Sequence, residues 1–307
     1  MKEFEFIDRL KNYLPKEDKV LSIGDDAARI GNLLLAKDIL VENIHFLPST
    51  PIDFVIHKLF ASNISDICAM GGVAKYALLG IGIPENYPSE NEIIDSIKKY
   101  TMKYNIALLG GDTTGSKKEL FLSLTIIGYT GKNTLLRSGA KPGDLLFVSR
   151  PLGLSRISLE KELGKNNFKN IDKYSHYMNE PEIKLAKILS DNNIATSCID
   201  VSDGLGRDAG HISKESNVRV IINGDKIPTD HLANFPVDPV DYFLSSGEEF
   251  ALLFTTPPEL QDILLEKSSK AGISPILLGY LSEGGGVYIK SAKGLEDIST
   301  KGHEHSF

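Results

Sequence analysis

Cysteine is scarce in this chain, tryptophan is absent, and no apolar run approaches the roughly 18 residues that a transmembrane helix needs. Cys68 and Cys198 lie far apart and form no CxxC pair, so the sequence predicts reduced, buried thiols and no disulfide scaffold. The first six residues carry acid where a signal peptide carries base and an apolar core. We therefore expect a cytoplasmic protein that has no membrane partner.

Positive charge is also in deficit. The 34 Lys and Arg residues face 41 Asp and Glu residues, which gives a net charge of −7 and a pI of about 5.6. A nucleic-acid-binding domain ordinarily carries a basic face, so nucleic acid is not expected as a partner. An acidic chain can instead gather carboxylates that bind divalent cations. Covalent nucleophilic catalysis lacks support, because we find no Gly-x-Ser-x-Gly elbow and no cysteine paired with a base.

The 307 residues alternate predicted helices and strands, and the composition of 41% hydrophobic and 24% charged residues is typical of a soluble α/β or α+β protein. Single cores rarely grow past about 250–300 residues, and the Gly- and Pro-marked stretch 137–144 predicts a boundary between domains 1–137 and 138–307. The predicted helices cover residues 3–14, 52–69, 89–104, 154–163, 182–191, 205–216 and 258–270. The predicted strands cover residues 27–30, 32–40, 74–83, 120–129, 145–149, 198–201, 218–223, 250–255, 275–281 and 287–290.

The stretch Gly24-Asp25-Asp26-Ala27-Ala28 places two adjacent carboxylates between small residues. Side chains at successive strand positions point to opposite faces, so at least one of these carboxylates should face a cleft. A polar turn between two strands is the alternative, because Asp readily bonds its own backbone. The same format, an Asp beside small residues at or near the end of an element, recurs at Asp26, Asp38, Asp66, Asp112, Asp200 and Asp203.

Six such carboxylates favour a shared metal site, although a helix cap or a turn is the simpler interpretation of any single one. Mg²⁺ prefers hard oxygen ligands, and it is usually held by one or two carboxylates together with substrate phosphates. Small neighbouring residues leave room for phosphate chains and hydrated ions. The pattern therefore predicts a magnesium site that binds a phosphorylated substrate.

Two glycine motifs are not interpreted as nucleotide sites. Gly110-x-x-x-x-Gly115-Ser116-Lys117 has P-loop spacing, but Ser and Lys are in the wrong order and a strand follows, so a hairpin loop is predicted. Gly204-x-Gly206-x-x-Ala209 follows a strand and opens a helix, as a dinucleotide fingerprint does. Asp200 and Asp203 stand where the pyrophosphate would approach, however, and their charges would repel it unless metal ions intervene.

With these stretches in view, the chain resembles the thiamine-monophosphate kinase (ThiL) family of the aminoimidazole-ribonucleotide-synthetase-like (PurM-like) superfamily. The resemblance runs from about Gly24 to the C-terminus. It rests on six short motifs that stand in the family's order and spacing: Gly24–Ala27, Asp38–Phe46, Ala61–Gly71, Gly110–Thr114, Arg137–Asp144 and Ile199–Leu205.

The resemblance implies a fold with an N-terminal domain that dimerises through its sheet and a larger C-terminal α/β domain. It implies in-line transfer of the γ-phosphoryl group of ATP to thiamine monophosphate, assisted by several Mg²⁺ ions, with K⁺ as a further candidate. The implied metal ligands are Asp26, Asp38, Asp66, Asp112, Asp200 and Asp203, and the implied catalytic residues are Asp38, Asp66, Asp112 and Arg137. The implied ATP contacts are Tyr104, Gly111, Asp112, Arg137 and Ser202, and the implied contacts to thiamine monophosphate are His45, Glu248 and His303.

Three stretches depart from the family's pattern. Ala36-Lys37-Asp38 stands where the family usually has Ser-Thr-Asp, so Lys37 keeps only the position of a metal ligand. Residues 246–250 read Ser-Gly-Glu-Glu-Phe in place of Gly-Gly-Glu-Asp-Tyr, and His303 replaces an aromatic substrate contact. We hypothesise that the Lys37 ammonium replaces the charge of one metal, so that fewer ions bind. The alternatives are another ATP-dependent phosphorylating or cyclising enzyme of the superfamily, or a homologue that binds nucleotide without turnover.

Overall fold

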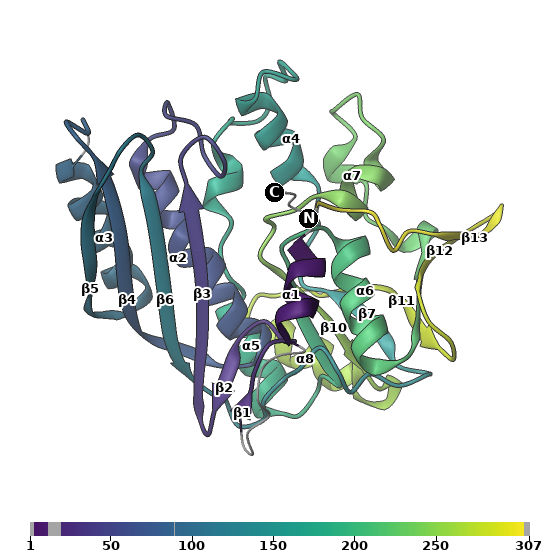
Figure 1. Ribbon diagram of the computed structural model, residues 1–307. Helices are drawn as coiled ribbons and strands as arrows, with labels where there is room; N and C mark the ends of the chain where they lie inside the picture. The colour runs from purple at the N-terminus through teal and green to yellow at the C-terminus, as the bar shows by residue number, and fades with distance from the viewer. Residues whose placement is uncertain (1–2, 12–19, 89, 304–307) are drawn as a thin grey trace.

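The computed structural model describes residues 3–11, 20–88 and 90–303 as two mixed α/β halves, each built on one sheet (Figure 1). In the first half six strands lie in the order β1-β2-β3-β6-β4-β5. Their bounds are β1 Val20–Leu21, β2 Ala28–Ile30, β3 Leu33–Val41, β4 Val73–Pro84, β5 Ala107–Ser116 and β6 Phe121–Tyr129. Neighbouring strands are antiparallel except β4 and β5, which run parallel and are joined by α3 (Glu90–Tyr104).

The second half carries a seven-stranded sheet in the order β13-β12-β9-β11-β7-β10-β8. Its strands are β7 Leu145–Val148, β8 Ser197–Val201, β9 Arg219–Asn223, β10 Ala251–Thr256, β11 Ile276–Ser282, β12 Val287–Ser291 and β13 Gly294–Asp297. The remaining helices are α1 Glu3–Lys11, α2 Ile52–Ala69, α4 Leu154–Glu162, α5 Ile183–Asp191, α6 Leu205–Ser216, α7 Pro239–Ser245 and α8 Gln261–Lys270. Short 3₁₀ turns lie at Ser175–Met178, Gly224–Lys226, Asp230–Leu232 and Pro258–Leu260. None of the helices in the described ranges combines the length and the apolar character that a bilayer crossing requires.

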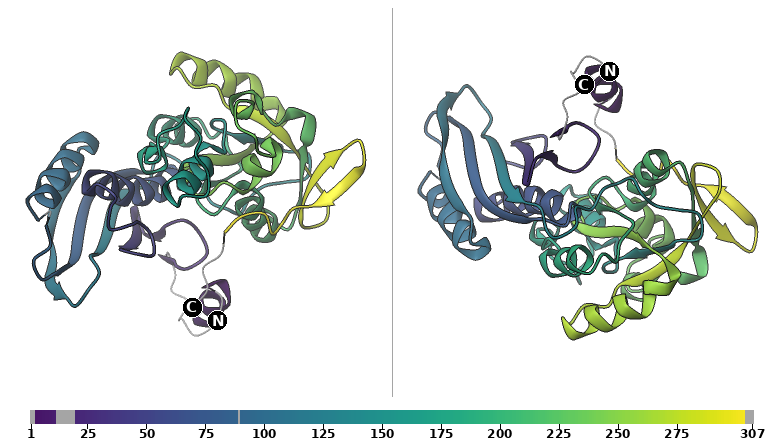
Figure 2. Two further views of the ribbon diagram at one scale, coloured as in Figure 1. Left: turned by 90° about the horizontal axis from the view of Figure 1, so that it is seen from above. Right: turned by 90° about the horizontal axis from the view of Figure 1, so that it is seen from below.

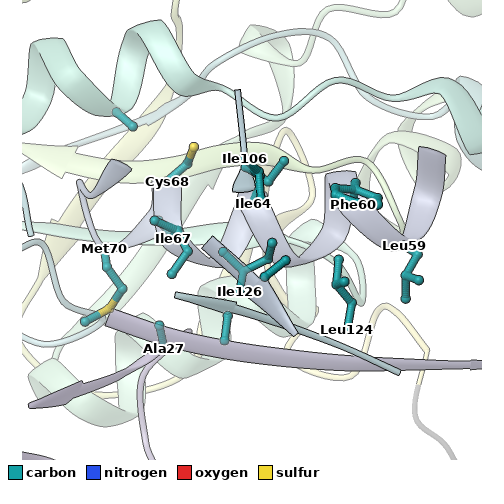
Figure 3. Packing of buried hydrophobic residues seen from close by; sticks show 14 of the residues in the cluster. Ala27, Leu59, Phe60, Ile64, Ile67, Cys68, Met70, Ile106, Leu124 and Ile126 are labelled. Atoms are coloured by element: carbon teal, nitrogen blue, oxygen red, sulfur yellow. The ribbon is translucent and has the colours of Figure 1, made fainter. Parts of the chain in front are cut away.

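Helix α2 joins the two halves. Of its 18 residues 14 are buried, because the helix packs against β3 and β6 of the first sheet, against α3 and α5, and against β8 of the second sheet. A helix that is apolar on all sides is a core helix. In Figure 3, Ile64 and Ile67 of α2 lie against Ile126 of β6, within one buried cluster. The polar side chains of α2 therefore lie deep in the molecule, where the two halves meet.

Helices α2 and α3 cover one face of strands β3, β6, β4 and β5, and no helix among the described residues covers the other (Figures 1 and 2). Along β3, Leu34, Ala36 and Leu40 are buried against the helices, whereas Lys37 and Ile39 are exposed on the opposite side. The strand register extends this second face across the sheet. We call it the outward face, and it includes Lys37, Ile39, Val73, Leu78, Asp112, Phe121, Ser123, Thr125 and Tyr129.

The structure confirms most of the predicted elements, and α2 matches the predicted helix at 52–69. The hairpin loop predicted at residues 110–117 is wrong, because Gly110 to Ser116 continue β5 and pair with β4 along their whole length. Helix α7 and strand β13 were not predicted, although Asp238 caps α7 through the N–H groups of Val240 and Asp241. The last residues of the helix predicted at 3–14 lie outside the described residues.

Candidate active site

Three carboxylates from three elements meet where the two halves join. Asp26 lies in the turn before β2, Asp66 in the last turn of α2, and Asp200 in β8. Their oxygen atoms lie within 4.8 Å of one another. Two oxygens on one Mg²⁺ ion are up to about 4 Å apart, since each Mg–O bond is close to 2 Å. The three side chains therefore have nearly the spacing of a shared magnesium site without further movement of the backbone.

Helix α2 fixes two of these three carboxylates. It carries Asp66 itself, and the hydroxyl of the preceding Ser65 donates to Asp200 Oδ2 at 2.6 Å. Asp200 is 3% exposed, in an edge strand whose five residues are all buried. Because α2 packs directly on β8, the buried helix sets the separation between the carboxylate of one half and the carboxylate of the other.

Arg137, which follows the first half, faces the same carboxylates. Its Nη2 donates to Asp26 Oδ1 at 2.9 Å, and its backbone N–H donates to Asp25 Oδ1 at 2.7 Å. The Asp26 side chain is 1% exposed, and its Oδ2 has no hydrogen-bond partner among the described residues. Leaving a buried carboxylate oxygen without a partner is costly. A divalent cation would satisfy this oxygen, so the residues present fit the metal that the sequence predicts.

The carboxylates also perturb one another's ionisation. Burial, and then the charges of three neighbouring carboxylates, hold the pKa of Asp66 well above its usual value. Burial and the charge of Asp26 raise the pKa of Asp200 to about 8. Burial lowers the pKa of the Arg137 guanidinium, but the Asp26 carboxylate has the larger effect, and the net shift of this pKa is upward. One arginine does not neutralise the cluster, and a bound cation would favour its ionised form.

We expect the metal-free protein to lose stability as the pH rises from about 4 to about 8. Asp66 and Asp200 bind protons more tightly in the folded chain than in the unfolded chain, where an Asp has a pKa of about 3.9. The folded state therefore holds more protons in this range, and the free energy of unfolding falls as the protons leave. Urea unfolding at several pH values without metal measures this slope, and saturating Mg²⁺ should flatten it. Equal slopes with and without Mg²⁺ would show that these carboxylates do not bind the ion.

Another set of predicted residues gathers nearer the start of α2. The backbone N–H of Asp38 donates to Asn63 Oδ1 at 3.1 Å. The Asp38 side chain alternates with those of the exposed Lys37 and Ile39, which places it on the helix-covered face of β3. Lys58 forms an ion pair with Glu248, and its ammonium donates to the carbonyl oxygen of His45 at 3.2 Å. Burial raises the pKa of Glu248, but the Lys58 ammonium outweighs it and the net shift is downward. His45 and Glu248, some 200 residues apart in the chain, thus share one neighbour.

The second group whose geometry could hold a metal ion contains Asp203 together with Asp208 and His211. Asp208 Oδ2 accepts three successive backbone N–H groups, those of residues 202–204, at 3.1 to 3.2 Å. The backbone N–H of His303 donates to the carbonyl oxygen of Asp203 at 2.8 Å. The end of the described chain therefore lies beside the loop that carries two further predicted site residues, at positions 202 and 203.

Lys37 and Asp112 lie on the outward face, away from Asp66 and its neighbours. Lys37 Nζ donates to Ser123 Oγ at 2.6 Å, on the side of β3 opposite to the adjacent Asp38. Asp112 is exposed on the edge strand β5, and its carboxylate accepts the backbone N–H of the next residue at 3.0 Å. A single chain therefore does not bring all six predicted carboxylates into one cluster.

Tyr104 and Gly111, both predicted to contact ATP, have structural roles in this chain. The Tyr104 hydroxyl lies 2.8 Å from His57 Nε2 and donates to Glu180 Oε2 at 2.9 Å, which ties α3 to the second half. Gly111 has a φ of 153°, and a Cβ there would lie 1.8 Å from the carbonyl oxygen of Leu79. Glycine is therefore required at this position by the β4–β5 pairing. The contacts of both residues with ATP stay predictions.

Comparison with known proteins agrees with this arrangement. Residues 24–130 match the family model of the AIR synthase related protein N-terminal domain, and residues 141–291 match that of the C-terminal domain. The thiamine-monophosphate kinase of Haemophilus influenzae is 34% identical, over 92% of this chain and 90% of its own length. The chain belongs to the thiamine-monophosphate kinase family. The enzyme of that name from Aquifex aeolicus is 31% identical, over 99% of this chain and 97% of its own.

Among solved structures, AaThiL complexed with AMPPCP and TMP matches this member of the thiamine-monophosphate kinase family with a TM-score of 0.84 and 28% identity. The match covers 99% of this chain and 97% of that one. Together with the two family models, it confirms the predicted two-domain PurM-like fold. The exact domain boundary at residue 137 stays a prediction.

Sequence reasoning missed several polar residues that surround the predicted ones. Lys58 and Ser65 both lie within the apolar stretch that forms α2, and each contacts a predicted site residue. Charged and hydroxyl side chains inside a helix that is otherwise apolar were the available signal, since such groups are rarely buried without a partner. Asp208 and His211 lie within α6, where helix periodicity gave no reason to connect them with the loop that precedes the helix.

Proposed function

We propose that this protein transfers the γ-phosphoryl group of ATP to thiamine monophosphate and so produces thiamine diphosphate. The observation that carries the proposal is the meeting of Asp26, Asp66 and Asp200 beside Arg137, within a chain of the thiamine-monophosphate kinase family. Support comes from the related structure, which was determined with TMP and with AMPPCP, an analogue of ATP. The same geometry suits phosphoryl transfer, because it places fixed negative ligands and one fixed positive group around a single point.

Magnesium ions are the cofactors that these carboxylates fit. Asp26, Asp66 and Asp200 would hold one, and we propose Asp38 and Asp203 as further ligands, with K⁺ as an additional candidate ion. When bound, Mg²⁺ supplies charge neutralisation and orientation of the phosphates. The buried, unpartnered Oδ2 of Asp26 is the strongest support for a metal on this chain.

Phosphoryl transfer to this acceptor requires little proton transfer by the protein. The acceptor is a phosphate oxygen that is already anionic, so no strong general base is required. The difficulty lies in bringing two polyanions together, which makes positioning and charge neutralisation the main tasks. Arg137 stays protonated because Asp26 pairs with it, so its guanidinium can face a phosphate at any physiological pH.

The two substrates would bind next to each other, since the backbone N–H of Glu248 donates to the carbonyl oxygen of Ser202 at 2.7 Å. We place thiamine monophosphate near His45 and Glu248, with His303 as a further contact. ATP is assigned to the side of Arg137 and Ser202, with Tyr104, Gly111 and Asp112 as the other contacts expected from the family. The shared contact with Lys58 supports the pairing of His45 with Glu248.

A homodimer formed through the outward face would complete this site. Exposed apolar side chains stand on that face across three strands, and no described helix covers them: Ile39, Val73, Leu78, Phe121 and Tyr129. A surface of this kind commonly marks an interface. Because Asp112 shares the face, we propose that it acts in the site of the partner subunit and not in the site of its own chain.

Lys37 also lies on the outward face. We propose that its ammonium replaces the charge of one metal ion, so that this chain binds fewer Mg²⁺ ions. Replacing Lys37 by Thr restores a hydroxyl at the position where the family usually has one, so we expect Lys37→Thr to bind more Mg²⁺ per chain and to shift the Mg²⁺ dependence of turnover. Magnesium titration in the presence of AMPPCP measures the first effect, and initial rates measure the second. Lys118→Thr, in the exposed turn after β5, is the control. An unchanged magnesium dependence in Lys37→Thr would falsify the idea that the ammonium replaces a metal.

A kinase assay with ATP, Mg²⁺ and thiamine monophosphate tests the proposed function. Formation of thiamine diphosphate is the expected result. If AMPPCP binds but no thiamine diphosphate forms, the enzyme assignment is wrong and a nucleotide-binding role without this turnover replaces it. We propose the cytoplasm as the compartment, supported by Cys68 and Cys198, which are both free and buried.

A further inference from the structure

Helix α2 holds a buried lysine two turns before Asp66. The Lys58 side chain is 4% exposed, and its ammonium forms an ion pair with Glu248 Oε1. It also donates to the carbonyl oxygen of His45 at 3.2 Å and lies 5.3 Å from the centre of the Tyr177 ring. Lysine ordinarily keeps its ammonium in water, and a buried ammonium is tolerated only when it is paired. These three contacts account for its burial.

Glu248, the ion-pair partner of Lys58, belongs to the second half of the molecule, whose backbone fixes its position. Glu248 has a φ of 54°, a left-handed conformation that is unfavourable for a residue with a Cβ. Its backbone N–H donates to the carbonyl oxygen of Ser202 at 2.7 Å, and its own carbonyl accepts from Asn179 Nδ2 at 2.7 Å. The backbone is thus fixed from two sides, while the carboxylate, on a side chain that is 32% exposed, is oriented by Lys58.

The position of Lys58 separates two groups of the proposed site. On one side is Glu248, which faces solvent in part. On the other is Asp38, whose carboxyl pKa is raised by burial, an effect that the charge of Lys58 offsets only in part. The guanidinium of Arg137 and the carboxylate of Asp26 form a different contact, in which Lys58 takes no part. The lysine is therefore built into the end of the site that faces His45 and Glu248.

We propose that Lys58 is a positioning residue for the phosphate acceptor: its ion pair aims the Glu248 carboxylate at a substrate that carries a cationic ring and a phosphate. The inference rests on the proposed function, since Glu248 is the expected contact to thiamine monophosphate. It adds a residue that no family motif named above contains. Loss of Lys58 then weakens acceptor binding through Glu248 and leaves nucleotide binding in place.

The test compares Lys58→Met, which keeps length and loses charge, with Lys58→Arg, which keeps the charge. Lys58→Met should raise the KM for thiamine monophosphate at least about tenfold, with the KM for ATP within about twofold, because a buried charge pair is broken on one side only. Lys58→Arg should recover most of the loss. Calorimetric binding of thiamine monophosphate and of AMPPCP, measured separately, gives the same split without turnover. Lys99→Met, which removes an exposed partner of Asp53 at the start of α2, is the matched control.

Glu248→Gln breaks the same pair from its more exposed side and keeps the test usable if Lys58→Met does not fold. If Lys58 acts through Glu248, adding Lys58→Met to Glu248→Gln should raise the acceptor KM by no more than about twofold further. Equal losses for acceptor and nucleotide, or independent effects of the two changes, would overturn the inference. The proposed function fails differently, with a wild-type protein that neither binds nor phosphorylates thiamine monophosphate.

Discussion

Replacing Asp66 by Asn is expected to lower kcat by at least about 100-fold and, at the same time, to stabilise the metal-free protein. Burial, and then the charges of three neighbouring carboxylates, hold the pKa of Asp66 well above its usual value. Asn has the same shape and no charge, so the repulsion disappears along with one metal ligand. Functional sites commonly keep such unfavourable arrangements, and relieving one is worth about 1 kcal/mol. Thermal unfolding with and without Mg²⁺, beside initial rates, measures both effects.

Asp53→Asn is the control for this prediction, because Asp53 lies on the same helix and its role is different. Its carboxylate accepts from Lys99 and Tyr100 at 2.7 and 3.0 Å, outside the cluster. Asp53→Asn should therefore lower stability slightly and leave kcat unchanged. Wild-type protein should gain thermal stability from Mg²⁺, and Asp66→Asn should lose that gain. An Asp66→Asn variant that keeps the Mg²⁺ shift, or that is less stable than wild type without metal, would contradict the metal assignment.

Patterns within single elements were predictable from the sequence. The helix at 52–69 follows from its apolar run and from the glycines that end it, and the structure confirms its limits. The segment 110–116 was predicted incorrectly because glycine there was interpreted as a sign of a turn. In the structure these glycines permit close pairing of β5 with β4, and a Cβ on Gly111 would collide with Leu79. Local composition does not distinguish a turn from a tightly paired strand, since the partner strand lies elsewhere in the sequence.

The site could be predicted in its residue types and only partly in its grouping. Asp26, Asp66 and Asp200 are brought together by the packing of α2 on β8, a contact between the two halves that no local pattern encodes. Strand alternation did contain the information that Lys37 and Asp38 face opposite ways. The sequence does not say which of these two side chains points toward the metal site. That becomes clear only from the packing of α2 on one side of the sheet. The same fact separates Asp112 from the cluster, and this separation leads to the second large prediction.

Mixing Asp112→Asn chains with Asp66→Asn chains, each nearly inactive alone, is expected to restore about a quarter of wild-type activity. In a two-fold symmetric dimer whose chains exchange at random, half of the dimers contain one chain of each kind. If Asp112 acts in the partner's site, one site of each mixed dimer has both native carboxylates, and the other has neither. Half of the sites in half of the dimers are then active. An assay of thiamine diphosphate formation by the unfractionated mixture measures this quarter. The mixed dimer, purified after co-expression with two affinity tags, should reach about half of wild-type activity.

The matched control is a mixture of Asp66→Asn and Asp200→Asn chains, whose carboxylates lie in the same cluster of one chain. Every site of that mixed dimer lacks one of the two, so its activity should stay at the level of the separate variants. The outward face predicts the difference, because Asp112 and the apolar residues around it point away from the helices that carry the rest of their own site. Mixed dimers of Asp112→Asn and Asp66→Asn that form but stay inactive would show that Asp112 serves its own chain. The β5 edge would then have to move toward α2 during the reaction, since in the present structure it faces the other way.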